Sequence, residues 1–303
     1  MLIAQKLEEM NMNCKDARGS VSAFLLAHKA DLGRYTMQQV ADATYTSRPT
    51  LVRIAKRMGY SGWNELVQKY TEECRYYADH FSHISPNVPF EKGDTPSMIA
   101  DKVGHVMVES ALDTLEQLDA AALERAARLL AGARRIAMLC ISPNSLLAEL
   151  FQRKMLQIGV NVQLVNQAEQ FFLAQSLTAE DCAIVISYSG NNEQRAPMRY
   201  LNCLQENGVP IIAVTSAGDN LLRSKATCVL TMSSREKLYS KIATFATEES
   251  ISLLLNALYA CYFALDYDKN FAFKVNASRA IEQQRVSTVQ EAMEDDRAFP
   301  LRR

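Results

Sequence analysis

The sequence predicts two domains of different fold class: an α-helical domain over residues 1–81, and an α/β domain over residues 96–270 whose parallel sheet is flanked by helices. Two short helices separated by a tight turn are indicated between Thr36 and Gly59, and a further helix begins near Ser61. From Arg135 onward, apolar β-rich runs alternate with helical segments. Residues 82–95 are rich in turn-forming residues and are expected to be a linker, and residues 271–303 a helical tail.

Two short helices separated by a three-residue turn are predicted on either side of Tyr45. Thr36 is placed to cap the first helix and Ser47 the second, which Gly59 ends. Pro49 falls in the first turn of the second helix, where backbone N–H groups have no acceptor within the helix. The apolar stripe of this helix consists of Leu51, Ile54, Ala55 and Met58. This order is the helix-turn-helix arrangement, which places its second helix in the major groove of DNA.

The face opposite that stripe is uniformly positive. Between Ser47 and Tyr60 the sequence has four cations and no carboxylate, which suits contact with phosphates. A solvated helix face would explain the charge alone, but the order of the elements favours a DNA interface. The residues expected to contact DNA are Thr46, Ser47, Arg48, Thr50, Arg53, Lys56 and Arg57.

The residues around the second helix carry a more specific signature. Ser47, Thr50 and Arg53 are spaced as Ser-x-x-Thr-x-x-Arg, and a Gly-Tyr-Ser-Gly-Trp turn follows from Gly59. This pattern resembles the helix-turn-helix signature of RpiR-type transcriptional regulators. The resemblance implies a DNA-binding regulator in which a sugar isomerase (SIS) domain follows the helical domain. Within the turn, Ser61 is expected to cap the next helix, and the only tryptophan to pack against the helix-turn-helix core.

Five strand candidates define the second domain. They are Ile136–Ile141, Val160–Val165, Cys182–Ser187, Pro210–Thr215 and Cys228–Met232. Helices are predicted over Ser145–Ile158 and Pro197–Asn207, and two more, one from Thr95 toward Leu118 and one from Asp119 to Gly132, precede the sheet. Near-continuous apolar strands separated by helices predict a parallel sheet covered on both faces. Ligands of such sheets bind beyond the carboxyl ends of the strands.

Two hydroxyl-rich loops follow the first and third predicted strands. One is Ser142-Pro143-Asn144-Ser145, and the other is Ser187-Tyr188-Ser189-Gly190-Asn191-Asn192. Serine hydroxyls, free N–H groups at a helix start and a glycine that lets the backbone approach are the donors that a phosphate needs. Helix caps and turns would explain one such loop. Two of them resemble the phosphosugar site of the SIS domain, whose second loop reads Ser-x-Ser-Gly-x-Thr.

The same resemblance implies the ligand residues. Ser187, Ser189 and Gly190 match the SIS loop, whereas Asn192 stands where the family usually has threonine and Cys140 where it often has glycine. The residues expected to bind a phosphosugar are Ser142, Ser145, Ser187, Tyr188, Ser189, Gly190, Asn192 and Glu249. No cofactor is expected.

Composition argues against several other classes of protein. The seven cysteines include no C-x-x-C pair, which argues against a disulfide framework. Those in apolar strand-like runs, expected to be buried, are Cys140, Cys182 and Cys228. No signal peptide is evident and the apolar stretch Ile251–Leu265 is short for a bilayer span, so a cytoplasmic protein with no membrane partner is expected. His80 and His83 form an isolated H-x-x-H pair, and no metal is expected there.

Three functions are compatible with the sequence. A phosphosugar isomerase needs an acid–base pair, and because all four histidines precede the sheet, Glu248 and Glu249 are the remaining candidate bases. The helix dipole explains two carboxylates at a helix start equally well. A structural DNA-binding protein would require both loops to be empty. The favoured function is a regulator, a homodimer or dimer of dimers that binds a two-fold symmetric double-stranded operator and a phosphosugar or related effector.

Overall fold

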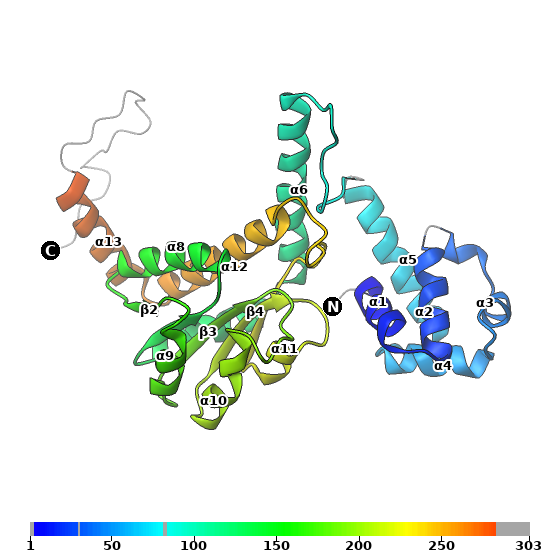
Figure 1. Cartoon of the computed structure of the whole chain (residues 1–303), viewed down its shortest axis with the longest axis horizontal. Coiled ribbons are helices and arrows are strands. Elements are labelled where there is room, and N and C mark those ends of the chain that lie inside the picture. Colours follow the sequence, from blue (N-terminus) through cyan, green and yellow to red (C-terminus); the bar gives the residue numbers. More distant parts are fainter. Residues whose placement is uncertain (1–2, 30, 81–83, 283–303) are drawn as a thin grey trace. The chain divides into compact units, whose positions relative to one another are not determined.

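The computed structural model describes residues 3–29, 31–80 and 84–282 (Figure 1). The chain forms two compact units. The first comprises residues 1–117, 216–224 and 231–250, and the second comprises residues 118–215, 225–230 and 251–303.

The N-terminal part of the chain is helical, as predicted. Its elements are α1 (Ile3–Asn13), α2 (Ala17–Ala27), the 3₁₀ turn η1 (Leu32–Arg34), α3 (Met37–Ala43), α4 (Arg48–Arg57) and α5 (Trp63–His80). They enclose one apolar core, in which Leu7, Leu25, Leu51 and Leu66 are fully buried. Trp63 belongs to this core, which confirms the expected packing of the tryptophan.

Local interactions explain why α3 and α4 begin and end where they do. Thr36 and Gln39 form a reciprocal capping box at the start of α3. Tyr45 adopts a φ of 51° in the turn, and Gly59, with a φ of 95°, follows the end of α4. The prediction for Ser61 was wrong. Its hydroxyl and backbone N–H both donate to the carboxylate of Glu65, so this serine closes the turn before α5 by donating rather than by capping the helix.

The α/β part contains a five-stranded sheet in the order β2-β1-β3-β4-β5. Its strands are β1 (Ile136–Leu139), β2 (Val162–Leu164), β3 (Cys182–Ser187), β4 (Ile211–Ser216) and β5 (Cys228–Met232). The pairings of β1 with β2, β1 with β3 and β3 with β4 are parallel. The predicted fold class, a helical domain followed by a parallel sheet flanked by helices, is confirmed.

Helices precede, cover and follow this sheet. They are α6 (Pro96–Gln117), α7 (Ala120–Gly132), α8 (Asn144–Leu156), α9 (Gln170–Ser176), α10 (Leu201–Glu206), α11 (Leu221–Lys225), α12 (Phe245–Leu265) and α13 (Tyr267–Glu282). Lys154 of α8 hydrogen-bonds Asn256 of α12, and Figure 1 shows these two helices along one face of the sheet with α9 and α10 along the other. Asp119 caps α7 through a bond from the Ala121 N–H, as predicted.

Two sequence predictions about helices need correction or completion. The segment predicted as one helix over Pro197–Asn207 is a 3₁₀ turn, η2 (Met198–Tyr200), followed by the six residues of α10. The predicted helical tail, residues 271–303, is helical in α13 as far as Glu282, and its remainder lies outside the described residues.

The apolar stretch Ile251–Leu265 forms most of α12, and its first half supplies core residues such as Leu254 and Leu258. Among the described helices none is by itself long and apolar enough to cross a membrane; α12 and α13 meet that criterion only as a pair bent by 109°. Cys140, Cys182 and Cys228 are buried, as expected. The H-x-x-H pair falls on His80, whose side chain is not described, and on His83, outside the described residues.

Candidate nucleic-acid interface and ligand loops

The polar face of α4 is open to solvent along its whole length. Its four cations, Arg48, Arg53, Lys56 and Arg57, are all exposed, and none forms an ion pair with a carboxylate of the described chain. Leu51, Ile54 and Ala55 on the opposite face are buried in the helical core. The burial pattern therefore fixes which face of α4 a partner can reach.

Hydroxyl groups organise the N-terminal end of this helix. Ser47 stands at the N-cap position, but its hydroxyl contacts the Thr50 hydroxyl at 3.0 Å instead of capping a backbone N–H. Arg53 donates from Nη2 to the same Thr50 oxygen at 3.1 Å. The amides of the first turn have no side-chain cap, and Arg53 is held toward that end of the helix. Both features suit contact with the phosphate-lined groove of DNA.

The turn before α4 is held rigidly although its outer surface is exposed. The Thr46 N–H donates to the Ala41 carbonyl at 2.8 Å, and the buried Thr44 hydroxyl donates to the Val40 carbonyl at 2.7 Å. The Thr46 and Thr44 hydroxyls lie 3.0 Å apart. Tyr45, between them, is 98% exposed. Sequence reasoning passed over this tyrosine, because an aromatic residue in a short turn carries no periodic signal.

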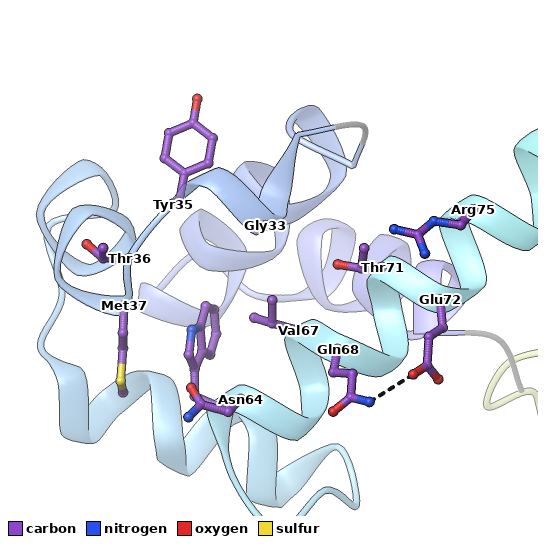
Figure 2. Close-up of a pocket in the computed structure, with 11 residues that line it drawn as sticks. Gly33, Tyr35, Thr36, Met37, Asn64, Val67, Gln68, Thr71, Glu72 and Arg75 are labelled. Carbon is purple, nitrogen blue, oxygen red and sulfur yellow. Dashed lines mark hydrogen bonds between the residues drawn. The ribbon is translucent and has the colours of Figure 1, made fainter.

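A hollow of about 480 Å³ lies on the helical domain between the start of α3 and α5 (Figure 2). Tyr35, Thr36, Asn64 and Gln68 are among its lining residues, and Gln68 hydrogen-bonds Glu72 at its edge. None of the residues predicted to contact DNA lines this hollow. It is therefore separate from the cationic face of α4.

The first serine loop leads from β1 into α8. Cys140, buried at the end of β1, has its pKa raised to about 12 by burial, so its thiol stays protonated. Its carbonyl accepts a 2.5 Å hydrogen bond from the buried side chain of Gln170, which fixes the start of the loop. Ser142 is exposed and Ser145 half-buried, and neither hydroxyl bonds to another described residue. Pro143, at the N-cap position, gives no side-chain cap; the Leu146 N–H donates to the Pro143 carbonyl at 3.0 Å, and the Asn144 and Ser145 N–H groups are the first-turn amides left for a ligand.

The second serine loop follows β3, the neighbour of β1 in the sheet. Leu139 of β1 pairs with Val185 of β3, so the loops after the two strands leave the same edge. Ser187 accepts a hydrogen bond from the Gly190 N–H at 3.3 Å, and Gly190 has a φ of 61°, which glycine adopts without strain. The half-buried Ser189 has a hydroxyl with no hydrogen-bond partner among the described residues.

The remaining predicted ligand residues differ in their surroundings. Tyr188 is half-buried, and its carbonyl accepts from the buried Thr215 hydroxyl at 3.4 Å. The Asn192 side-chain oxygen accepts from the Gln194 N–H at 3.3 Å, which leaves its amide nitrogen to donate. Glu249 lies in the first turns of α12, within the first compact unit, whereas the other predicted ligand residues all belong to the second.

A helix begins directly after only one of the two loops, although both were expected to lead into one. The first loop runs directly into α8, but after Gly190 the chain continues through turns until η2 and α10 begin. The donors of the second loop are therefore its hydroxyls and loop amides.

A pocket of about 770 Å³ adjoins these loops at the carboxyl ends of β1, β2 and β3. Its lining includes Ile141 from the first loop, Gln167 and Phe171 after β2, and Arg195 and Arg199 after the second loop. Sequence reasoning did not select either arginine, because both follow the segment that carries the motif.

Comparison with known proteins agrees with this two-part organisation. The model of the rpiR-family helix-turn-helix domain matches residues 1–74, and that of the SIS domain matches residues 129–260. The HTH-type transcriptional regulator HexR of Pseudomonas aeruginosa is 25% identical over 230 residues, which are 75% of this chain and 76% of HexR.

Solved structures share the fold at lower identity. The Vibrio vulnificus NanR protein, in complex with ManNAc-6P, aligns with a TM-score of 0.58 and 18% identity over 94% of this chain and all of that chain. The sugar isomerase domain of an RpiR transcription factor from Sphaerobacter thermophilus aligns with a TM-score of 0.53 and 18% identity, over 60% of this chain and 98% of that one.

A helix-turn-helix domain joined to a SIS domain defines a class of DNA-binding transcriptional regulators. With both domain models matched in this order, the chain belongs to the RpiR family of these regulators. The resemblance inferred from the Ser-x-x-Thr-x-x-Arg and Ser-x-Ser-Gly motifs is confirmed.

Proposed function

We propose that this regulator binds a two-fold symmetric operator as a homodimer through α4, and that a phosphorylated sugar or related metabolite bound at the two serine loops controls that binding. Residues 1–81 would form the DNA-binding domain, 82–95 the linker, 96–270 the effector-sensing domain and 271–303 a C-terminal tail. The protein would act in the cytoplasm, where operator and sugar phosphates meet.

The effector proposal rests on hydrogen-bond donors at the serine loops that have no partner in the described chain. The hydroxyls of Ser142, Ser145 and Ser189 have no hydrogen-bond partner in the described chain, the start of α8 is uncapped, and Gly190 opens the backbone. Polar groups gathered at the carboxyl edge of a parallel sheet normally serve a ligand. NanR, which shares the fold and whose structure contains ManNAc-6P, supports a phosphosugar as that ligand.

We further propose that the effector is bound and not converted. The SIS fold also occurs in isomerases, so the fold does not decide this point. No histidine lies beyond His105, and Glu248, one of the two candidate bases, is hydrogen-bonded to Thr244. Proton transfer between carbons needs a positioned acid–base pair, most often including histidine, so the lack of histidine after His105 supports binding without conversion.

The two faces of α6 support the homodimer. The inward face is polar: Glu109 pairs with Arg235 at 2.7 Å, and the Thr114 hydroxyl lies 2.7 Å from that of Ser250. The outward face carries Val108, Leu112 and Leu115, which are 60%, 41% and 51% exposed and recur at helical spacing. An apolar stripe on the outside of a helix is the pattern of a protein interface, and a second copy would give the symmetry that an inverted-repeat operator requires.

Calorimetric titration with sugar phosphates tests the effector site. Ser189→Ala removes one donor to a charged acceptor and should weaken binding by about 1.5–3 kcal/mol, whereas Ser224→Ala, outside both loops, should leave it unchanged. Equal affinity for the wild-type protein and the Ser142→Ala and Ser189→Ala variants would place the ligand elsewhere. Steady conversion of the titrated sugar phosphate into an isomer would favour the enzyme instead.

Measuring the oligomeric state of α6 variants tests the proposed dimer interface. Leu112→Glu should shift light-scattering masses toward the monomer and weaken operator binding, because a carboxylate in an apolar interface is costly. Met107→Glu, on a different side of α6, is the matched control. A dimer that persists unchanged in the Leu112→Glu and Val108→Glu variants would rule out this face.

A further inference from the structure

The pocket beside the serine loops is continuous with them along the chain. Ile141, in its wall, directly precedes Ser142. On the other side the Arg195 N–H donates to the Asn192 carbonyl at 3.1 Å, which joins the arginine segment to the end of the second loop. A ligand held at the serines therefore has this pocket as its immediate extension.

Two arginines dominate the chemistry of the pocket. The Arg199 N–H donates to the Arg195 carbonyl at 3.0 Å, which closes the turn that contains both residues, and both arginines line the pocket. The Arg199 guanidinium lies over the ring of Tyr200, 5.8 Å from its centroid. This cation–π contact favours one orientation of that side chain.

No carboxylate among the lining residues neutralises the positive charge of this pocket. Two arginines and no carboxylate line it, while Glu169 and Glu193 lie next to lining segments in the sequence but outside the lining. Neither Arg195 nor Arg199 forms an ion pair within the part of the chain that the structure describes. A guanidinium presents a planar fork of donors that matches carboxylates and phosphates.

We propose that Arg195 and Arg199 bind a second anionic group of the effector. The effector is then a sugar-acid phosphate or a sugar bisphosphate, and not a sugar whose only anionic group is one phosphate. This inference rests on the proposed binding of a phosphosugar at the serine loops. The first phosphate occupies those loops, and the second carboxylate or phosphate reaches the arginines. Gln167 and Gln194 in the same wall supply neutral donors and acceptors for sugar hydroxyls between the two.

Matched ligands isolate the second anionic group. Glucose 6-phosphate and 6-phosphogluconate have the same number of carbons but differ at C1, and fructose 6-phosphate and fructose 1,6-bisphosphate differ by one phosphate. Calorimetry on the full chain should show the doubly acidic member of at least one pair binding about tenfold or more tightly than its partner. The Arg195→Gln/Arg199→Gln double variant should lose this preference, and Arg153→Gln, an exposed arginine outside the pocket, should keep it.

Each outcome has a distinct meaning. Equal binding within both pairs, or a preference that survives in the double variant, would overturn the arginine inference and leave the phosphosugar proposal standing. Loss of the preference in the double variant but not in Arg153→Gln would support the inference. If none of the four compounds binds or raises the thermal stability of the wild-type protein, the inference is overturned together with the sugar-phosphate effectors that these compounds represent.

Discussion

Arg53 is the side chain of α4 whose removal is most informative. It is exposed, has no carboxylate partner in the described chain, and is held toward the start of the helix by a 3.1 Å bond to the Thr50 hydroxyl. If it reads a guanine edge, Arg53→Ala should cost about 1–3 kcal/mol per half-site, or about 2–6 kcal/mol for a symmetric dimer, on the operator only. If it contacts phosphate, affinity should fall on every sequence, and the salt slope should become shallower by about 0.9 per half-site.

Fluorescence anisotropy separates these outcomes. Operator duplex and a scrambled duplex are titrated at several salt concentrations with the wild-type protein, Arg53→Ala and Lys69→Ala. Lys69 is an exposed cation of the same domain that pairs with Glu72 at 2.8 Å, so its removal controls for net charge. Operator binding unchanged in an Arg48→Ala/Arg53→Ala double variant would refute the assignment of α4 as the DNA-contacting helix.

Two further predictions concern stability. Asp181 is buried and accepts a hydrogen bond from Arg135 at 2.7 Å, and this bond, with its other hydrogen bonds, lowers the pKa of the carboxyl. The ionised carboxylate therefore stabilises the folded state fully above the unfolded pKa of about 3.9, and this stabilisation is lost as pH falls through the lower folded pKa. Denaturant melts should show Asp181→Asn about 3 kcal/mol less stable at pH 7 but with a flatter acid limb, and a parallel pH profile would contradict this. Leu51→Ala, in the core under α4, should lower the unfolding free energy of the helical domain by about 2–5 kcal/mol, measured by circular dichroism, whereas a loss below about 1 kcal/mol would mean that α4 is not packed there.

Strong local signals explain which elements could be predicted. The sequence alone located β3 and β5 at their observed boundaries, since each is an apolar, β-rich run flanked by turns. The helices α3 and α7 could also be predicted, because a capping residue precedes each of them. By contrast, α9 has seven residues and α11 five, too few to display helical periodicity.

The first two helices were missed although their signals were present. Ile3, Leu7 and Met10 recur at helical spacing in α1, and Asp16 caps α2 by accepting from the Arg18 N–H. Both helices precede the segment that carries the family signature, and no helix was predicted before Thr36. The omission affected no site residue, because α1 and α2 supply core to the helical domain and not its cationic face.

A sequence motif marks only part of the candidate site. The serines and the glycine after the strands can be selected by residue type and spacing, but Arg195 and Arg199 join the proposed site through the course of the chain after Asn192. The pocket they line is assembled from segments that follow three different strands. Such a set has no spacing rule in the sequence, since tertiary contacts and not local periodicity bring its members together.

Coupling between effector and operator needs a physical connection, and Asn87 provides a candidate in the predicted linker. Its side-chain oxygen accepts from the Lys237 N–H at 2.6 Å, and its carbonyl accepts from the Ile242 N–H at 2.8 Å. Glu236, the residue before Lys237, accepts from the Ala246 N–H at 2.7 Å and so caps the start of α12, the helix that carries Glu249. A change at the start of α12 would therefore reach the linker through this loop, in addition to any route through the helices between Thr95 and Gly132.

Asn87→Ala should accordingly reduce the coupling between the two ligands more than it reduces either affinity. Coupling free energies are typically about 1–3 kcal/mol and reciprocal, so a sugar phosphate that weakens operator binding tenfold must itself bind tenfold more weakly to the operator complex. Operator affinity measured with and without saturating effector gives this factor for the wild-type protein, for Asn87→Ala and for the exposed neighbour variant Val88→Ala as control. If Asn87→Ala keeps the full wild-type ratio of operator affinities with and without effector, the signal does not pass through this contact. A ratio near one in Asn87→Ala alone, with the affinities for operator and effector each retained, would mean that this side chain holds the linker in its ligand-responsive position.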